Sequence, residues 1–246
     1  MPHPFGMSPS EDEVQMAIYN VKGLFTTLPE TTCGHRTECC NSGCPNMYYS
    51  EYLNLRIECI EKMEKPARID LTLECLRRYL TPQDVMKPKP CPLLNDNMCS
   101  IYEARPYRCR TYGLIPDEEY DKMVDSVAKD FKVPKEKIPL CQQCKMVKVK
   151  PEFEATFPDG KLPKDKVKND QILVKTTDIM IGMPVQIQQL YGYLTFHDWH
   201  LLFEIGQQWL ETLSKLRSSK KWADLKGEEK EKFMQSLKKS LETVNE

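Results

Sequence analysis

The chain has 246 residues, of which 40% are hydrophobic and 29% are charged, and its formal net charge is −1 at pH 7. These values are typical of a globular protein and provide no overall charge that would attract nucleic acid or a membrane surface. No apolar run approaches the ~20 residues of a membrane-spanning helix, and residues 1–12 lack the basic and apolar regions of a signal peptide. We therefore expect a cytoplasmic protein without membrane insertion or nucleic-acid binding.

The chain begins with a strong helix signal. Ser10 and Glu13 have the spacing of a capping box. Apolar residues then recur at helical spacing from Val14 to Leu28, where Pro29 ends the pattern. The sequence therefore predicts a first helix from Ser10 to about Leu28, and turn-forming residues predict a loop over 33–44.

The middle of the chain alternates helices with a short hairpin. Helical periodicity predicts a helix from 46 to about 64 after Pro45, and another from Asp70 to Leu80. Between them and the next helix, Leu93 and Leu94 are predicted to pair with Ile101 and Tyr102 across an Asn-Asp-Asn turn. Periodicity then predicts a helix from about 117 to 131.

The composition changes after Lys150, where Pro151, Pro158, Gly160 and Pro163 predict a linker. Four helices are expected beyond it, at 164–181, 185–193, 195–218 and 222–244. The third follows a capping box formed by Thr195 and Asp198. The sequence thus predicts a mainly α fold, with a cysteine-cluster metal-binding domain at 1–150 that carries the hairpin, and a helical region at 151–246.

The chemically informative residues are the 11 cysteines. An odd number excludes complete pairing within the chain, and clustered cysteines in the reducing cytoplasm favour metal binding over disulfides. Cys59 and Cys75 fall inside predicted helices without a cysteine at ligand spacing, so we interpret them as small hydrophobic residues. The candidate metal ligands are Cys33, Cys39, Cys40, Cys44, Cys91, Cys99, Cys109, Cys141 and Cys144.

The spacing of these cysteines indicates which kind of metal centre they could bind. Thiolates suit zinc and iron–sulfur centres, but only Cys141 and Cys144 have the two-residue spacing of a zinc knuckle. The adjacent pair Cys39 and Cys40 is awkward for one compact zinc site, because neighbouring side chains tend to point apart. The irregular spacing favours an iron–sulfur cluster and leaves zinc as the alternative.

One segment resembles a known family. It is the run Cys91-Pro-Leu-x3-Asn97-x-Cys99-x-Ile101-Tyr102-x2-Arg105-Pro106-x2-Cys109-Arg110. This run resembles the signature of the YkgJ-type cysteine-cluster family, whose members are described as chelating zinc or iron. The family's upstream run is usually Cys-x2-Cys-x2-Cys-Cys, and Cys39-Cys40 matches its end, whereas Cys33 and Cys44 depart from it. Members that resemble flagellin lysine N-methylases also belong to the family, although no glycine-rich loop for S-adenosylmethionine is visible here.

Three further groups of side chains could have a functional role, and each also has an ordinary structural interpretation. His35, in the first cysteine loop, is either a ligand or an exposed loop histidine. His197, His200 and Glu204 share one helix face, which suits a second metal site or a polar flank of a core helix. The lysines around Cys141 and Cys144 form either a solvated surface or a cationic surface that stabilises an anionic cluster and attracts an acidic partner.

Arg105, Arg108 and Arg110 accompany the central cysteines. We expect them to donate hydrogen bonds to cluster sulfurs or to backbone carbonyls rather than to bind substrate.

The leading functional hypothesis is an iron–sulfur protein that transfers electrons, or that helps to assemble or activate a larger enzyme complex. The alternatives are a structural zinc interaction module and a lysine N-methylase-like enzyme, and no standard catalytic motif decides for an enzyme. The helical region is expected to dock a protein partner through exposed aromatic and apolar residues, rather than only to pack on the cysteine domain. These residues are Leu190, Tyr191, Tyr193, Trp199, Phe203 and Trp209.

Overall fold

The structure is a computed structural model that describes residues 9–32, 38–41, 43–81, 87–137, 147–183, 194–219 and 221–243. Helices account for 66% of it, and the only sheet in these ranges is a two-stranded antiparallel hairpin. The mainly helical fold with a short hairpin is therefore confirmed. Within the same ranges, no helix is long and apolar enough to cross a membrane.

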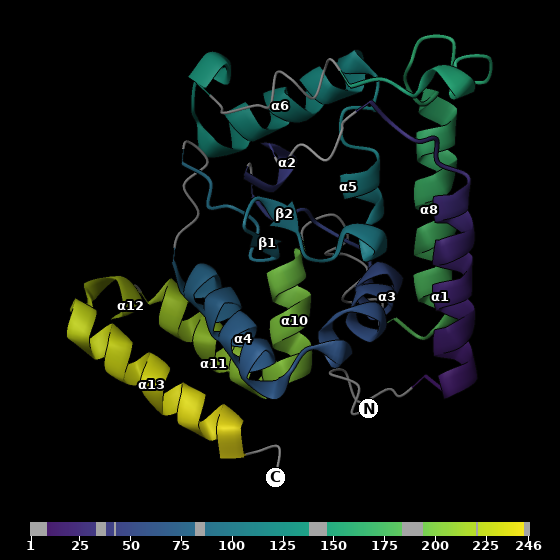
Figure 1. The fold of residues 1–246 in the computed structure, drawn as a ribbon. Coiled ribbons are helices and arrows are strands. Elements are labelled where there is room, and N and C mark those ends of the chain that lie inside the picture. The colour runs from purple at the N-terminus through teal and green to yellow at the C-terminus, as the bar shows by residue number, and fades with distance from the viewer. Residues whose placement is uncertain are drawn as a thin grey trace.

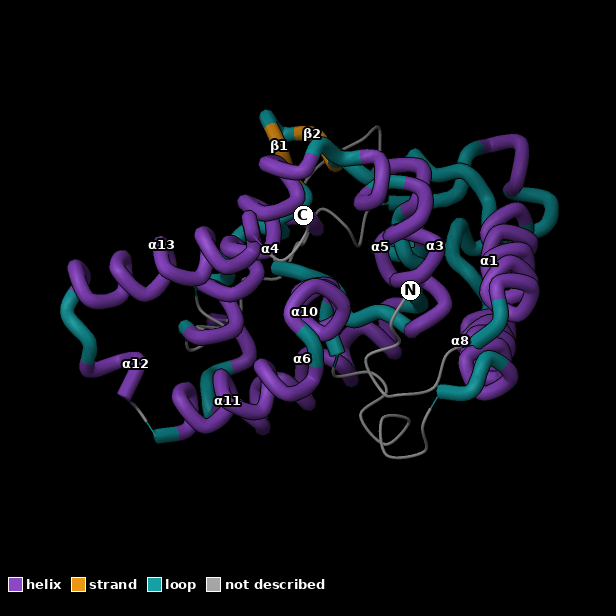
Figure 2. Tube along the Cα trace, turned by 90° about the horizontal axis from the view of Figure 1, so that it is seen from below, coloured by secondary structure: helices purple, strands orange, loops and turns teal. Residues whose placement is uncertain are grey.

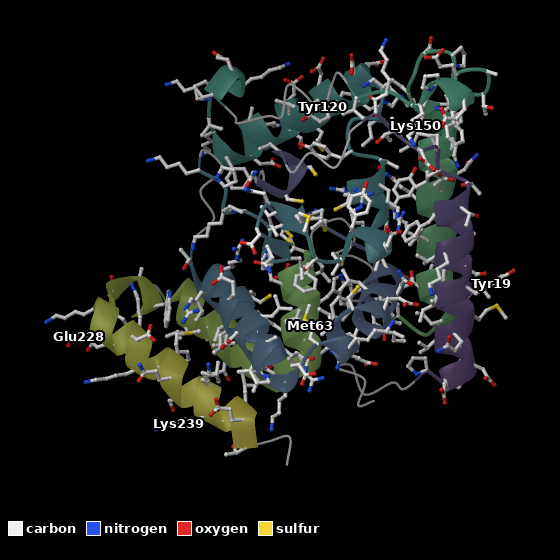
Figure 3. All side chains as sticks on the ribbon, viewed as in Figure 1. Tyr19, Met63, Tyr120, Lys150, Glu228 and Lys239 are labelled. Atoms are coloured by element: carbon white, nitrogen blue, oxygen red, sulfur yellow. The ribbon has the colours of Figure 1, made fainter. Side chains whose placement is uncertain are left out.

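Helix α1 (Glu11–Thr26) forms one end of the molecule. Its N-cap Ser10 accepts a hydrogen bond from the backbone N–H of Glu13, and the Glu13 carboxylate accepts one from the backbone N–H of Ser10. The predicted capping box is confirmed. Helix α1 packs on α8 (Lys164–Met180), and Figures 1 and 2 show the two side by side. Tyr19 projects outward from α1 into solvent (Figure 3).

Helix α3 (Tyr49–Glu58) packs against α1 and has a buried N-terminus. The carboxyl groups of two side chains accept hydrogen bonds from the backbone N–H groups at its start. Asp178 of α8 accepts hydrogen bonds from the backbone N–H groups of Tyr49 at 2.9 Å and Ser50 at 2.8 Å. Glu51 accepts one from the backbone N–H of Tyr48 at 2.8 Å. Helix α8 thus fixes the start of α3 from a position far away in the sequence.

The observed boundaries of α3 differ from the predicted helix over 46–64. Asn46 forms an isolated β-bridge with Thr195 and cannot be helical at the same time. At the other end, Cys59 is the C-cap of α3, and a short 3₁₀ turn, Ile60–Lys62, follows it. Cys59 therefore lies at a helix end rather than inside a helix.

Helix α4 (Lys65–Leu80) begins before Asp70, the residue at which the sequence predicted its start. Pro66 stands in its first turn, where the missing N–H of proline costs no hydrogen bond and its fixed φ suits a helix. The helix therefore extends five residues further toward the N-terminus, and Asp70 lies within it.

The hairpin consists of β1 (Leu94–Asn95) and β2 (Met98–Cys99). Leu94 is paired with Cys99, and Asn95 with Met98. Asp96 and Asn97 between them have φ values of 46° and 59°, as a tight two-residue turn requires. The hairpin is confirmed, but the predicted pairing of 93–94 with 101–102 is wrong, because this turn is shorter than expected.

Two short helices and one long helix lie near the hairpin in the chain. Helix α2 (Glu38–Asn41) is a single turn inside the predicted loop, and α5 (Tyr107–Arg110) is a second short helix. Helix α6 (Asp117–Phe131) matches the prediction. The segment from Pro151 to Pro163, predicted to be a linker, contributes Phe157 and Leu162 to a small buried cluster that also contains Leu114, Val147 and Val149.

The C-terminal part contains four helices in the described residues. They are α10 (Phe196–Ile205), α11 (Gln207–Ser218), α12 (Lys221–Asp224) and α13 (Gly227–Thr243). The predicted capping box of Thr195 and Asp198 is present. The predictions of single helices over 195–218 and 222–244 are wrong, because Gly206, with φ of 80°, ends α10, and a break at 225–226 separates α12 from α13. The helix predicted at 185–193 lies outside the described residues.

The main core joins residues from both sides of position 150. Helix α10 packs closely on α4, and its Trp199 is 0% exposed with its indole N–H donating to the carbonyl of Met47 at 3.0 Å. The ring of Trp199 lies 5.4 Å from that of Tyr49, and the ring of Phe203 lies 5.0 Å from that of Tyr52. Trp199 therefore belongs to the core and not to an exposed docking surface, which corrects that interpretation. The side chains of Leu190, Tyr191, Tyr193 and Trp209 lie outside the described residues.

Candidate metal centre

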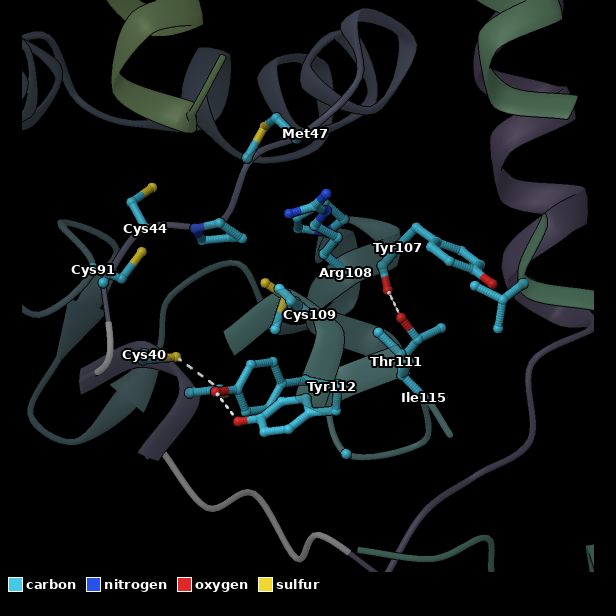
Figure 4. A pocket seen from close by; sticks show the side chains of 18 of the residues that line it. Cys40, Cys44, Met47, Cys91, Tyr107, Arg108, Cys109, Thr111, Tyr112 and Ile115 are labelled. Carbon is cyan, nitrogen blue, oxygen red and sulfur yellow. Dashed lines mark hydrogen bonds between the residues drawn. The ribbon is translucent and has the colours of Figure 1, made fainter. Parts of the chain in front are cut away.

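A pocket of about 560 Å³ lies between α2, the hairpin, α5, α6 and α8. Six cysteines line it: Cys39, Cys40, Cys44, Cys91, Cys99 and Cys109. Figure 4 shows the side chains of Cys44 and Cys91 next to each other on one side of this pocket. All six are among the predicted ligands, whereas Cys59 and Cys75 do not line the pocket.

Backbone contacts bring the cysteine segments together. The backbone N–H of Cys91 donates to the carbonyl of Cys40 at 2.6 Å, which joins α2 to the residues before the hairpin. The hairpin then turns the chain back so that Cys99 on β2 stands near Cys91, and α5 supplies Cys109. Residues from distant parts of the sequence therefore share one pocket.

Helix α2 explains how adjacent cysteines both reach the pocket. Neighbouring residues on a helix point about 100° apart, whereas neighbours on a strand point to opposite faces. The Sγ atoms of Cys39 and Cys40 lie 3.9 Å apart. The expectation that this pair points apart is therefore wrong.

The pocket thiols form two hydrogen-bonded groups. Cys40 bonds to both Cys39 and Cys99, and this contact lowers the pKa of Cys39 to about 7 and the pKa of Cys99 to about 6. The contacts with both neighbours raise the pKa of Cys40 itself, because the proton that the thiols share stays on Cys40. In the second group, the hydrogen bond from Cys44 lowers the pKa of Cys91. These hydrogen bonds favour the thiolate forms of Cys39, Cys91 and Cys99, and the thiolate is the form that binds metal.

The arginines of the motif act mainly on the backbone. Arg105 donates to the carbonyl of Tyr102 at 2.9 Å, and Arg110 donates to the carbonyl of Arg105 at 2.8 Å. The prediction of backbone carbonyl partners is confirmed for these two. Arg108 differs, because its exposed side chain lines the pocket and lies between Met47 and Cys109 in Figure 4.

The donor set fits a metal centre in its chemistry but is not assembled as a complete site. Across the described ranges, no three Cys, His, Asp or Glu side chains converge closely enough to hold a metal ion. Six thiols nevertheless exceed the four donors that a tetrahedral metal takes. The remaining predicted ligands, Cys33, Cys141 and Cys144, lie outside the described residues, as does His35.

The alternative candidate site on α10 has other partners. His200 is hydrogen-bonded to the hydroxyls of Tyr52 and Thr72 inside the core. Glu204 pairs with the guanidinium of Arg56 at 2.6 Å. This arrangement agrees with polar groups that flank a core helix.

Several pocket residues carried no signal in the sequence. They come from α6, α8 and the turn before α6, and include Tyr112, Glu119, Tyr120, Lys164, Lys168 and Gln171. The sequence did not link these positions to the cysteines, because only the packing of α6 and α8 around α5 places them beside the thiols.

Comparisons of this chain with protein-family models, with curated proteins and with solved structures find no match. The resemblance to the YkgJ-type family therefore rests on the residues of the 91–110 motif and on the Cys39-Cys40 pair.

Proposed function

We propose that this protein is a metal-binding accessory protein whose pocket holds an iron–sulfur cluster. The observation that supports the proposal is that six thiols from separate segments line a single pocket. Iron–sulfur clusters are held by cysteine thiolates, often from irregularly spaced motifs. The set is larger than one tetrahedral ion requires.

The first ligands we assign are Cys39, Cys91 and Cys99, because each lines the pocket in hydrogen-bond contact with another thiol, and this contact also lowers its pKa. Arg105 adds a positive charge that acts on both Cys39 and Cys99 and would offset the negative charge of a thiolate-bound cluster. A bound cluster would supply one-electron chemistry. Electron transfer, or the assembly or activation of a larger enzyme complex, is the role we propose for it.

A structural zinc module is the second candidate. Two thiolates on one tetrahedral zinc ion, each about 2.3 Å from the metal, lie about 3.8 Å apart. The Sγ atoms of Cys39 and Cys40 are 3.9 Å apart, which suits two ligands of one ion. No observation on the described residues favours the third hypothesis, a lysine N-methylase-like enzyme.

Metal and acid-labile sulfide analysis of the anaerobically purified full-length protein separates the first two candidates. We expect iron and sulfide in similar amounts, together with visible sulfur-to-iron charge-transfer absorption. Stoichiometric zinc without sulfide would refute the cluster and support the zinc module.

A further inference from the structure

The thiols line only part of the pocket, and the rest of the lining has a different character. Side chains from α6, α8 and the turn between α5 and α6 contribute Tyr112, Tyr120, Met123, Val167, Lys168 and Gln171. None of these is a thiol, and a metal centre bound to the cysteines leaves their presence in the pocket unexplained.

The size and the apolar lining suit a small molecule. The volume of about 560 Å³ falls within the range of roughly 300–1,000 Å³ that is typical of ligand pockets. Tyr112 and Tyr120 meet edge to face at 6.4 Å, with their hydroxyl oxygens 3.4 Å apart. Together with Met123 and Val167 they provide an apolar and aromatic surface.

The charges that line the pocket are unbalanced. Arg108, Lys164 and Lys168 are cationic, and Glu119 is the one carboxylate among the lining residues that the structure describes. Glu119 pairs with Lys164 at 2.8 Å. Arg108 and Lys168 are both exposed, and neither forms an ion pair with another described residue. Two cations without an ion-pair partner among the described residues therefore line the pocket beside an apolar surface.

We propose that the pocket binds a small organic anion, with its acidic group held by Arg108 and Lys168 and its apolar or aromatic body against Tyr112, Tyr120 and the neighbouring aliphatic side chains. Arg108 offers a planar set of N–H donors that suits a carboxylate or phosphate group, and Lys168 adds a point charge. The proposal does not rest on the identity of the metal.

The test uses two fluorescent probes on the full-length protein purified anaerobically. 1-Anilinonaphthalene-8-sulfonate combines two aromatic groups with one negative charge, and N-phenyl-1-naphthylamine has the same aromatic groups without the charge. Arg108→Gln and Lys168→Gln remove one pocket cation each. Lys175→Gln is the matched control, because Lys175 is an exposed lysine two turns further along α8 that does not line the pocket.

We expect Arg108→Gln and Lys168→Gln each to weaken sulfonate binding about three- to tenfold, and Lys175→Gln to leave it unchanged. Binding of the uncharged probe should be the same in all variants. Circular dichroism and metal content, measured on the same samples, should not change, which separates this result from a failure of the metal proposal.

Three outcomes would overturn the proposal. They are absence of sulfonate binding to the wild-type protein, equal effects of all three substitutions, and full displacement of the sulfonate by millimolar inorganic phosphate, which has no apolar body.

Discussion

The Nε2 atom of His200 on α10 lies 3.0 Å from the Oγ1 atom of Thr72 on α4. Thr72 already donates its single hydroxyl proton to the carbonyl of Arg68 at 2.8 Å, so Oγ1 accepts the proton of Nε2. The hydroxyl of Tyr52 lies 3.3 Å from Nδ1 and is left to donate to it. Both nitrogens of the neutral imidazole therefore have a hydrogen-bond partner, although the side chain is 0% exposed.

Replacement of His200 should change how stability responds to acid. Burial, assisted by the charges of Arg56 and Arg68, lowers the pKa of His200 to about 3 from its usual 6.5. Between these values the unfolded chain binds a proton that the folded chain does not, so the free energy of unfolding falls on acidification by about 1.4 kcal/mol per pH unit. His200→Gln removes this contribution. Urea denaturation from pH 6.5 to 4.5 should show the wild type losing stability relative to the variant, and parallel curves would contradict the prediction.

Glu51 should make the free energy of unfolding depend on pH in the opposite direction. Burial raises the pKa of Glu51 to about 7 from its usual 4.5, although backbone N–H groups of Tyr48 and Tyr107 lower it in part. Between these values the folded chain holds a proton that the unfolded chain has lost, so stability falls as the pH rises, again by about 1.4 kcal/mol per pH unit. The wild type should lose stability relative to Glu51→Gln as the pH rises from 4.5 to 7.

A matched control for Glu51 is available on α13. Glu228 is exposed there, so Glu228→Gln should follow the wild type at every pH in the same denaturation series. If Glu228→Gln changes the pH dependence of the free energy of unfolding as much as Glu51→Gln does, then surface charge causes the effect and the buried carboxyl does not.

The sequence predicted elements well where their signal is local. The capping boxes at Ser10 and Thr195 each place the start of a helix, because both partners lie within four residues. The prediction for α3 failed because its start depends on Asn46 pairing with Thr195 and on Asp178 from α8. Such long-range partners leave no periodic pattern in the sequence.

The same distinction applies to the candidate site. Loop context and the 91–110 motif were sufficient to select the six pocket cysteines and to set aside Cys59 and Cys75. Arg108 was expected to serve the cluster or the backbone, and Lys168 carried no signal at all. Their shared pocket arises only when α8 packs beside α5 in the folded chain.

Replacement of glycine by alanine should have opposite effects on the free energy of unfolding at positions 206 and 23. Gly206, with φ of 80° and ψ of 163°, has a conformation that is nearly restricted to glycine, and no atom lies within 4 Å of an added Cβ. Gly23 is inside α1 and has equally open space. Gly206→Ala should therefore lower the free energy of unfolding by about 1–3 kcal/mol, and Gly23→Ala should raise it by about 0.5–1 kcal/mol.

Thermal or urea unfolding of both glycine variants measures the difference. Because neither added methyl group meets another atom, backbone conformation alone accounts for the expected signs. Loss of stability in both variants would show that α1 does not tolerate a larger residue at position 23, and would contradict the open surface seen there.

The metal proposal makes a matched prediction for two partly buried cysteines. Cys99 lines the pocket and bonds to Cys40, whereas Cys59 caps the end of α3 and does not line the pocket. Cys99→Ala should remove at least about half of the bound metal and of the visible absorption, since a cluster with a missing thiolate ligand is weakly held. Cys59→Ala should retain both. Each substitution should lower the stability of the polypeptide itself by a similar amount, about 1 kcal/mol, so metal and sulfide per chain, measured at equal folded fraction, isolate ligation from folding. Equal metal loss in both variants, or none in either, would exclude Cys99 as a ligand.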